Sequence, residues 1–189
     1  KEIKFDIETI RFIKYYFLQN KGDNKLLISI QNYFLKKGFS IFNWIHVCKE
    51  LFANKIYLTT KTPSKKAILN KNKGIEAFKL FGKSDIGQSM VIQNENILGL
   101  EAVEGTDNLL KRCYKYKKIG DKGILIKLSK YNQSKLLDVP TIGLKTLNFV
   151  KKYGYEGIFL EINKCIIIDK EQTIKFANDN NIFIASIKK

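Results

Sequence analysis

The residues best suited to chemistry lie where a predicted strand runs into a predicted helix, around Gly105, Thr106 and Asp107. Glycine permits a tight turn at this point, Thr106 stands where a helix N-cap is expected, and Asp107 falls in the first helical turn. A helix start of this kind exposes free backbone N–H groups that can hold a phosphate, and the helix dipole favours a carboxylate there. The pattern is consistent with a phosphoryl-hydrolysis centre, and the alternative that Thr106 and Asp107 only cap the helix stays open.

Acidic side chains near this turn could supply a metal site. Asp107, with Glu101, Glu104 or Asp85 nearby, could hold a Mg²⁺ ion through one or two carboxylates while leaving positions for phosphate oxygens and water. Strict strand alternation would place Glu101 and Glu104 on opposite faces, so both need not serve one site. The candidate metal ligands are Asp107, Glu101 and Asp85.

A second candidate is Lys127, which lies in a predicted strand that is otherwise apolar on both faces. A lysine in such a strand needs an anionic partner, which is either a phosphate or a structural carboxylate such as Asp138 or Glu161. The segment 138–143 that follows could be a ligand loop feeding a helix, with a hydroxyl from Thr141 and a close backbone approach at Gly143. A plain loop is the alternative.

Several other kinds of site find no support in the sequence. The three cysteines lie far apart, with no Cys-x-x-Cys pair, and the single His46 lies in an apolar stretch. Neither a thiolate nor a His-rich zinc site is expected, so metal chemistry would use oxygen ligands. The Walker pattern, the Gly-x-Gly-x-x-Gly pattern and Gly-x-Ser-x-Gly are all absent.

The composition indicates a globular protein with a strong positive charge. The chain has 189 residues, 44% of them apolar, and a formal net charge of +16. Such a charge invites a nucleic-acid interpretation, but only Arg11 and Arg112 are arginine, the residue that base-edge and phosphate recognition favour. AT-rich codons, which place lysine on solvated faces, are the alternative explanation. With no apolar run of about 20 residues and no signal peptide, the chain is expected to be cytosolic.

The elements that must position these residues divide the chain in two. Before residue 59, apolar periodicity predicts a helix capped by Asp6, a second helix ending at Gly38, a short strand over 39–42 and one or two helical turns over 44–52. The polar segment 59–66 contains Pro63 and lacks periodicity, so it is the predicted linker. The expected organisation is the remainder of an N-terminal domain over 1–58, the linker over 59–66 and a catalytic domain over 67–189.

Strands and helices alternate after the linker. The predicted helices cover residues 67–81, 106–117, 143–153 and 171–180, and the predicted strands cover 89–93, 97–104, 123–128, 157–162, 165–168 and 182–187. The first two strands are joined at residues 94–96, a hairpin-type connection. Elements mixed in this way predict an α/β domain with a mixed sheet.

Four segments, in order and spacing, resemble the LpxI family of UDP-2,3-diacylglucosamine pyrophosphatases. They are Asp85-Ile86-Gly87-Gln88-Ser89, Leu100-Glu101-Ala102-Val103-Glu104-Gly105-Thr106-Asp107, Gly123-Ile124-Leu125-Ile126-Lys127 and Asp138-Val139-Pro140-Thr141-Ile142-Gly143. The ordered set is far more specific than any single motif. Residues 21–27, 38–39 and 169–184 extend the resemblance over essentially the whole chain. The sequence departs from the family pattern at Tyr131, where a proline is usual, and near Leu136, where an arginine is usual.

The resemblance implies a Mg²⁺-dependent hydrolase of lipid A biosynthesis, which cleaves UDP-2,3-diacylglucosamine to UMP and 2,3-diacylglucosamine 1-phosphate. It also implies two domains, here an incomplete Rossmann-like N-terminal α/β domain and the C-terminal α/β domain, with the acylated sugar nucleotide between them. The family's catalytic aspartate matches Asp107. Because the chain starts without Met and without the family's opening Gly-rich strand, loop and helix, it is expected to be a fragment whose own activity is uncertain.

Residues and resemblance together give one predicted site. Its catalytic candidates are Asp107, Glu104 and Thr106, its substrate-binding candidates are Gly105, Lys127, Gln88, Asp138, Thr141 and Gly143, and its metal candidates are Asp107, Glu101 and Asp85. Peripheral contact with the inner membrane and a homodimer are further expectations, and no nucleic-acid partner is expected. The alternative functions are a basic nucleic-acid-binding module and a non-catalytic sugar-nucleotide-binding protein.

Overall fold

The computed structural model describes residues 6–17, 23–81, 87–130 and 138–188. The chain divides into two compact units, the first ending at Val47 and the second starting at Cys48. Asp138 is grouped with the first unit. This division lies earlier in the chain than the predicted linker.

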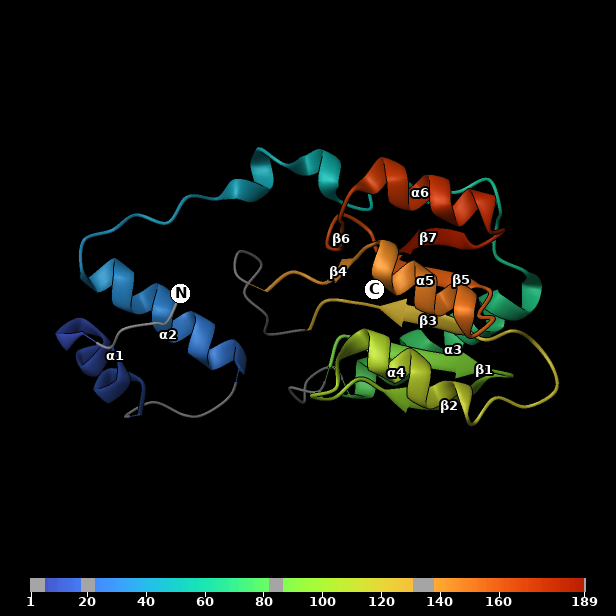
Figure 1. Cartoon of the computed structure of the whole chain (residues 1–189), viewed down its shortest axis with the longest axis horizontal. Helices are drawn as coiled ribbons and strands as arrows, with labels where there is room; N and C mark the ends of the chain where they lie inside the picture. The colour runs from blue at the N-terminus through green and yellow to red at the C-terminus, as the bar shows by residue number, and fades with distance from the viewer. Residues whose placement is uncertain (1–5, 18–22, 82–86, 131–137, 189) are drawn as a thin grey trace. The chain divides into compact units, whose positions relative to one another are not determined.

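The first unit contains two helices, α1 (Ile7–Phe17) and α2 (Asp23–Lys36), as the periodicity predicts. The carboxylate of Asp6 accepts a hydrogen bond from the backbone N–H of Thr9 at 2.7 Å, so the predicted N-cap of α1 is confirmed. The two helices contact each other through aromatic rings, with Phe12 edge-on to Tyr33 at a centroid distance of 5.3 Å. Figure 1 shows the two helices side by side.

The predicted strand over 39–42 is wrong, because these residues form no strand in the structure. A strand needs a neighbour to take its backbone hydrogen bonds, and the described residues of the first unit contain no other strand. The helical turns predicted over 44–52 are two short 3₁₀ turns, Trp44–His46 and Lys49–Leu51. The Rossmann-like character of this unit stays a prediction.

Residues of the predicted linker are bonded to the second unit. The hydroxyl of Thr59 accepts a hydrogen bond from the N–H of Ile184 at 2.9 Å. The backbone N–H and hydroxyl of Ser64 both donate to the carboxylate of Glu156 at 2.8 Å. The polar composition of 59–66 therefore accompanies specific hydrogen bonds.

The second unit is built on a five-stranded sheet with the order β2-β1-β3-β5-β7. Its strands are β1 (Ser89–Gln93), β2 (Asn96–Leu100), β3 (Ile124–Lys127), β5 (Gly157–Glu161) and β7 (Phe183–Ile187). The strand β1 is antiparallel to both β2 and β3, whereas β3, β5 and β7 are parallel to one another. The predicted α/β fold with a mixed sheet is confirmed.

Helices cover both faces of this sheet (Figure 1). The helix α3 (Lys65–Phe81) packs on one face, and α4 (Gly105–Tyr114), α5 (Leu144–Lys152) and α6 (Lys170–Asp179) pack on the other. Within α3, a Cβ atom on Gly74 would lie only 2.3 Å from Cδ1 of Ile126, so glycine at this position lets the helix approach the sheet. None of the described helices is long and apolar enough to cross a membrane.

A second, short ladder lies beyond the main sheet. The strands β4 (Thr141–Ile142) and β6 (Ile166–Ile167) pair in parallel. The prediction of a strand over 165–168 is thus confirmed at its centre. The segment 138–143, predicted as a loop, contains β4, because the N–H groups of Ile166 and Ile168 donate to the carbonyls of Pro140 and Ile142 at 2.8 and 2.9 Å.

Candidate active site

The helix α4 begins directly after the short turn that follows β2. Gly105 opens the helix with φ at +76°, a left-handed value that favours glycine. Thr106 is the second residue of the helix, and the residue in the cap position is Glu104. The prediction that Thr106 caps the helix is therefore wrong, because its hydroxyl turns inward to buried partners instead of to the backbone of its own helix.

The hydroxyl of Thr106 lies at the centre of a buried polar cluster. It donates to Oε1 of Glu101 at 2.8 Å and accepts from Nζ of Lys127 at 2.5 Å. The hydroxyl of Ser89 lies 3.1 Å away. Since a carboxylate only accepts and an ammonium only donates, Thr106 gives its one proton to Glu101 and takes the proton of Ser89. All three bonds that this hydroxyl can make are then formed within the protein.

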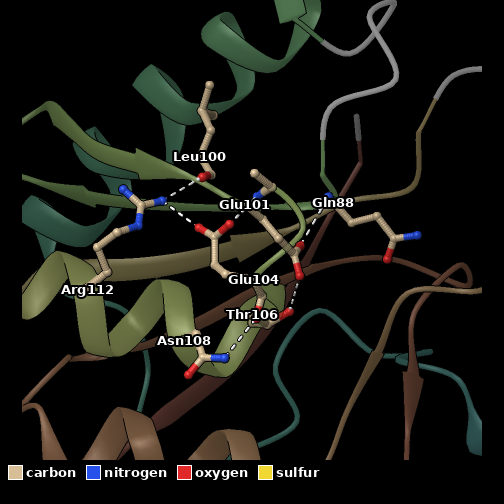
Figure 2. Close-up of polar contacts among 8 residues, drawn as sticks. Gln88, Leu100, Glu101, Glu104, Thr106, Asn108 and Arg112 are labelled. Carbon is tan, nitrogen blue, oxygen red and sulfur yellow. Dashed lines mark hydrogen bonds and ion pairs between the residues drawn. The ribbon is translucent and has the colours of Figure 1, made fainter. Parts of the chain in front are cut away.

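Glu101 is engaged on both of its carboxylate oxygens. Its Oε1 accepts from Thr106, and its Oε2 accepts from the backbone N–H of Gln88 at 3.1 Å. Figure 2 shows the carboxylate between these two donors, with the side chain of Gln88 extending away from it. The geometry makes Glu101 a support for the turn and for Thr106.

Glu104 faces a different partner. Its Oε1 pairs with Arg112 at 2.6 Å and its Oε2 accepts from the backbone N–H of Ala102 at 3.1 Å. The hydrogen bond from Arg112 lowers the pKa of Glu104. Arg112 also donates to the carbonyl of Leu100 at 3.0 Å (Figure 2). The two glutamates are thus directed to separate partners, so the structure does not join them in one carboxylate pair.

Lys127 is a buried cation that lacks a carboxylate partner among the residues that the structure describes. It ends β3, only 6% of its surface is exposed, and its ammonium bonds to the hydroxyl of Thr106. Glu161, one of its two predicted partners, instead accepts from Lys164 at 2.5 Å and from the hydroxyl of Ser129 at 2.6 Å. Asp138, the other, is grouped with the first unit and is described apart from this site.

Asp107 lies next to this cluster, in the first turn of α4. Its Oδ1 accepts a hydrogen bond from the hydroxyl of Thr146 at 3.0 Å. Its Oδ2 lies 3.3 Å from Nζ of Lys145, a side chain that is 82% exposed. Both partners belong to the first turn of α5, so the predicted catalytic carboxylate lies where α4 and α5 meet.

The remaining predicted residues are more scattered. The hydroxyl of Thr141 donates to the carbonyl of Val139 at 2.8 Å. A Cβ on Gly143 would lie 3.4 Å from Cβ of Ile168, an ordinary contact, so no protein neighbour requires glycine there, and the expected approach of a ligand to its backbone stays a prediction. Asp85 lies outside the described residues.

The described carboxylates do not form a complete metal site by themselves. Among the residues that the structure describes, no group of three His, Cys, Asp or Glu side chains could hold a metal ion. Mg²⁺ needs less than this, because it is often held by one or two carboxylates together with substrate phosphates and water. Asp107 fits that mode, since its Oδ2 is bonded only to an exposed lysine among these residues.

A comparison with protein families identifies the chain. The family model of the LpxI C-terminal domain matches residues 54–185. The chain belongs to the LpxI family. The resemblance in the four sequence segments is thereby confirmed.

A curated LpxI relative extends the similarity. The UDP-2,3-diacylglucosamine pyrophosphatase LpxI of Caulobacter vibrioides is 30% identical over 173 residues, which cover 88% of this chain and 62% of that relative. The chain thus spans less than two thirds of the length of the relative. The residues matched to the LpxI C-terminal domain include Glu101, Asp107, Lys127 and Thr146.

Sequence reasoning missed three members of the site, Ser89, Lys145 and Thr146. Ser89 pairs with Lys127 across the antiparallel ladder of β1 and β3, a register that could be read only after the two strands were known to be neighbours. Thr146 lies in the first turn of a predicted helix, as Thr106 does. A threonine at both helix starts was the available signal, although it does not show which helices lie side by side.

Proposed function

We propose that the intact protein hydrolyses the pyrophosphate bond of UDP-2,3-diacylglucosamine to UMP and 2,3-diacylglucosamine 1-phosphate, as a step of lipid A biosynthesis. In this reaction the oxygen of water attacks one phosphorus, and the bridging oxygen leaves with the other phosphate. Membership of the LpxI family and the name of the Caulobacter vibrioides relative support the substrate. The observation that carries the proposal is a buried lysine, Lys127, that contacts no carboxylate among the described residues and lies beside the helix start that presents Asp107.

Lys127 would bind the pyrophosphate. A buried ammonium is costly unless an anion neutralises it, and its bond to the hydroxyl of Thr106 brings no negative charge. The carboxylate of Glu101 lies one hydroxyl away and balances the charge only in part. A phosphate oxygen at Lys127 would complete its coordination and place the pyrophosphate at the start of α4.

Asp107 would hold the metal or orient the attacking water. Its position in the first turn of α4 places a negative charge near free backbone N–H groups. Mg²⁺, when bound, supplies neutralisation of the pyrophosphate charge and polarisation of the reacting phosphate. Asp107 is the described residue that fits this ion, and Asp85 remains a predicted ligand. Glu101 would support the site indirectly, through its hydrogen bond with the hydroxyl of Thr106.

The roles of the other predicted residues follow from their contacts. Thr106 would act by holding Lys127, and Glu104 would act by fixing the turn through Arg112. Gly105 would allow the turn and let a phosphate approach the backbone, because a Cβ there would have no heavy atom within 4 Å. Substrate contacts by Gln88, Asp138, Thr141 and Gly143 remain predictions.

The surroundings of the reaction are also part of the proposal. A cytoplasmic enzyme that takes an acylated nucleotide from the inner membrane would contact the membrane surface peripherally. Its many lysines would favour this contact, with about 1 kcal/mol for each one near anionic headgroups. A homodimer is proposed from the family resemblance.

The test is UMP release by the intact protein in detergent, with and without Mg²⁺. Replacing Asp107 by Ala is expected to lower turnover at least 100-fold, because the group that holds the metal or the water is lost. Glu171→Ala removes another first-turn carboxylate, at the start of α6, and is the matched control that should keep wild-type turnover. Wild-type turnover in a folded Asp107→Ala protein would contradict the proposal, as would tight uridine-nucleotide binding without hydrolysis at any Mg²⁺ concentration.

A further inference from the structure

The contact between Thr146 and Asp107 joins two helices that are far apart in the sequence. Thr146 lies in the first turn of α5, and only 7% of its surface is exposed. Its hydroxyl donates to Oδ1 of Asp107 at 3.0 Å, because a carboxylate can only accept. The most buried contact of the proposed catalytic carboxylate therefore comes from a residue to which neither the sequence nor the resemblance assigns a role.

The two oxygens of Asp107 lie in different surroundings. Oδ1 is held by the buried hydroxyl of Thr146, whose branched side chain has a restricted χ1 angle. Oδ2 faces the exposed ammonium of Lys145 at 3.3 Å. A rigid donor on one oxygen and a solvated, long side chain on the other fix the orientation of the carboxylate and leave Oδ2 accessible to an incoming group.

The packing of α4 on α5 does not depend on this hydrogen bond. The buried residues that join the two helices are apolar, and they include Leu109, Leu110, Leu147 and Val150. Apolar burial on this scale holds the helices together without the hydroxyl. The bond between Thr146 and Asp107 therefore acts mainly on the carboxylate.

We propose that Thr146 is a positioning residue for Asp107, a role that rests on the proposed function. Its hydroxyl fixes the plane of the carboxylate so that Oδ2 meets the metal or the attacking water. Replacing Thr146 by Val removes this donor and keeps the shape of the side chain. Because a misplacement of about 1 Å at a reacting group costs about 100-fold in rate, kcat is expected to fall about 10- to 100-fold while KM changes less than twofold.

Two further variants of the intact protein separate positioning from a structural effect. Thr146→Ser keeps the hydroxyl and should recover kcat to within about threefold of the wild type. Thr173→Val is the matched control, since Thr173 is a buried threonine early in α6 whose hydroxyl donates to the carbonyl of Ile168 at 2.7 Å. It should leave kcat unchanged. A wild-type kcat in Thr146→Val, or an equal loss in Thr173→Val, would overturn the proposal.

A measurement without turnover tests the bond itself. In a double-mutant cycle of Thr146→Val and Asp107→Ala, followed by urea unfolding, a hydrogen bond between the two side chains predicts a coupling of about three- to tenfold in the unfolding equilibrium constant. Absence of coupling would overturn the proposal whatever the kinetics. A wild type that releases no UMP, with the coupling present, would instead contradict the proposed function, so the two failures are distinguishable.

Discussion

Polar clusters lie at both ends of the antiparallel pair β1 and β3, and they differ in how completely their charged side chain is paired. At one end Ser89 lies opposite Lys127, beside Thr106 and Glu101. At the other end the loop before β3 carries Asp121, beside the hairpin that joins β1 to β2. Both clusters lie at an end of the same pair of strands, so the local architecture is shared. We therefore attribute the difference in their contacts to a difference in function.

The cluster around Asp121 is satisfied within the protein. Oδ1 of Asp121 accepts from the N–H of Gly123 at 2.7 Å, and Oδ2 accepts from the N–H of Asn94 at 2.8 Å. The side-chain amide of Asn70, in α3, donates to the same Oδ2 at 3.1 Å. The side-chain oxygen Oδ1 of Asn70 in turn accepts a hydrogen bond from the backbone N–H of Glu95 at 2.7 Å. These bonds connect α3, the hairpin and the start of β3.

The cluster around Lys127 differs because, within the part of the chain that the structure describes, no carboxylate contacts this cation directly. The ammonium meets a hydroxyl whose other bonds are already formed, and Glu101 is reached only through that hydroxyl. A complete network rigidifies a fold, whereas a buried group with remaining donors has capacity for a ligand. The comparison therefore assigns stability to the Asp121 end and binding to the Lys127 end.

The largest expected effect is the loss of activity in Lys127→Met. Because this variant removes the cation that would neutralise the pyrophosphate, kcat/KM should fall about 100- to 1,000-fold. The free energy of unfolding should change by no more than about 1 kcal/mol, since Lys127 forms no direct ion pair with any described residue. UMP release and urea unfolding of the same protein give both numbers.

A matched lysine variant is available at the same edge of the sheet. Lys164 follows β5 and pairs with the buried carboxylate of Glu161, so Lys164→Met should reduce stability and leave kcat/KM close to the wild type. Wild-type activity in Lys127→Met, or a comparable activity loss in Lys164→Met, would remove the distinction between a binding cation and a structural one.

The next effect in size is expected at the opposite end. Asp121→Ala leaves the N–H groups of Gly123 and Asn94 and the amide of Asn70 without their acceptor. The free energy of unfolding should fall by about 2–3 kcal/mol, while kcat/KM stays within about twofold. Thermal or urea unfolding measures the first quantity, and the UMP assay measures the second. A large loss of activity without a loss of stability would show that the two ends do not divide the tasks.

Much of the second unit could be predicted from the sequence, because its elements are apolar and sharply bounded. The ends of β1 match the prediction, and those of β2, β3 and α5 lie one to four residues from their predicted positions. The strand predicted over 97–104 stops at Leu100, since the chain turns there and Glu101 bonds to the N–H of Gln88. Periodicity predicts the apolar part of an element, whereas its end depends on contacts with distant residues.

The site is predictable only in part. Local pattern and family resemblance both point to Asp107, which lies in the first turn of a helix as expected. The contacts of Thr106 and Lys127 were beyond prediction, because they depend on the register between strands and on the inward rotation of a helix start. The strand predicted over 39–42 shows the same limit, since an apolar segment becomes a strand only where a partner strand is present.

Glu161 provides the smallest effect and a third polar group for the comparison, at the edge where Lys127 lies. Burial raises its pKa, but hydrogen bonds from Lys164 and Ser129 outweigh burial, and the pKa is lowered from 4.5. A carboxyl group whose pKa is lower in the folded state than in the unfolded chain stabilises the fold at pH values above its unfolded pKa. For Glu161 this contribution is lost as the pH falls below about 4.5 and through the folded pKa. The urea midpoint of the wild type should therefore fall with acid more steeply than that of Glu161→Gln.

The Lys164→Met variant sharpens this test, because it removes the strongest hydrogen bond that favours the charged form of Glu161. The urea midpoint of this variant should depend on pH less than that of the wild type. The corresponding difference in the free energy of unfolding should be about 1 kcal/mol or less, because Lys164 is partly exposed. Equal pH dependence in all three proteins would mean that Glu161 is not held by its partners in the folded state. The distinction between Glu161, whose charge is paired, and Lys127, which contacts no described carboxylate, would then have no counterpart in the free energy of unfolding.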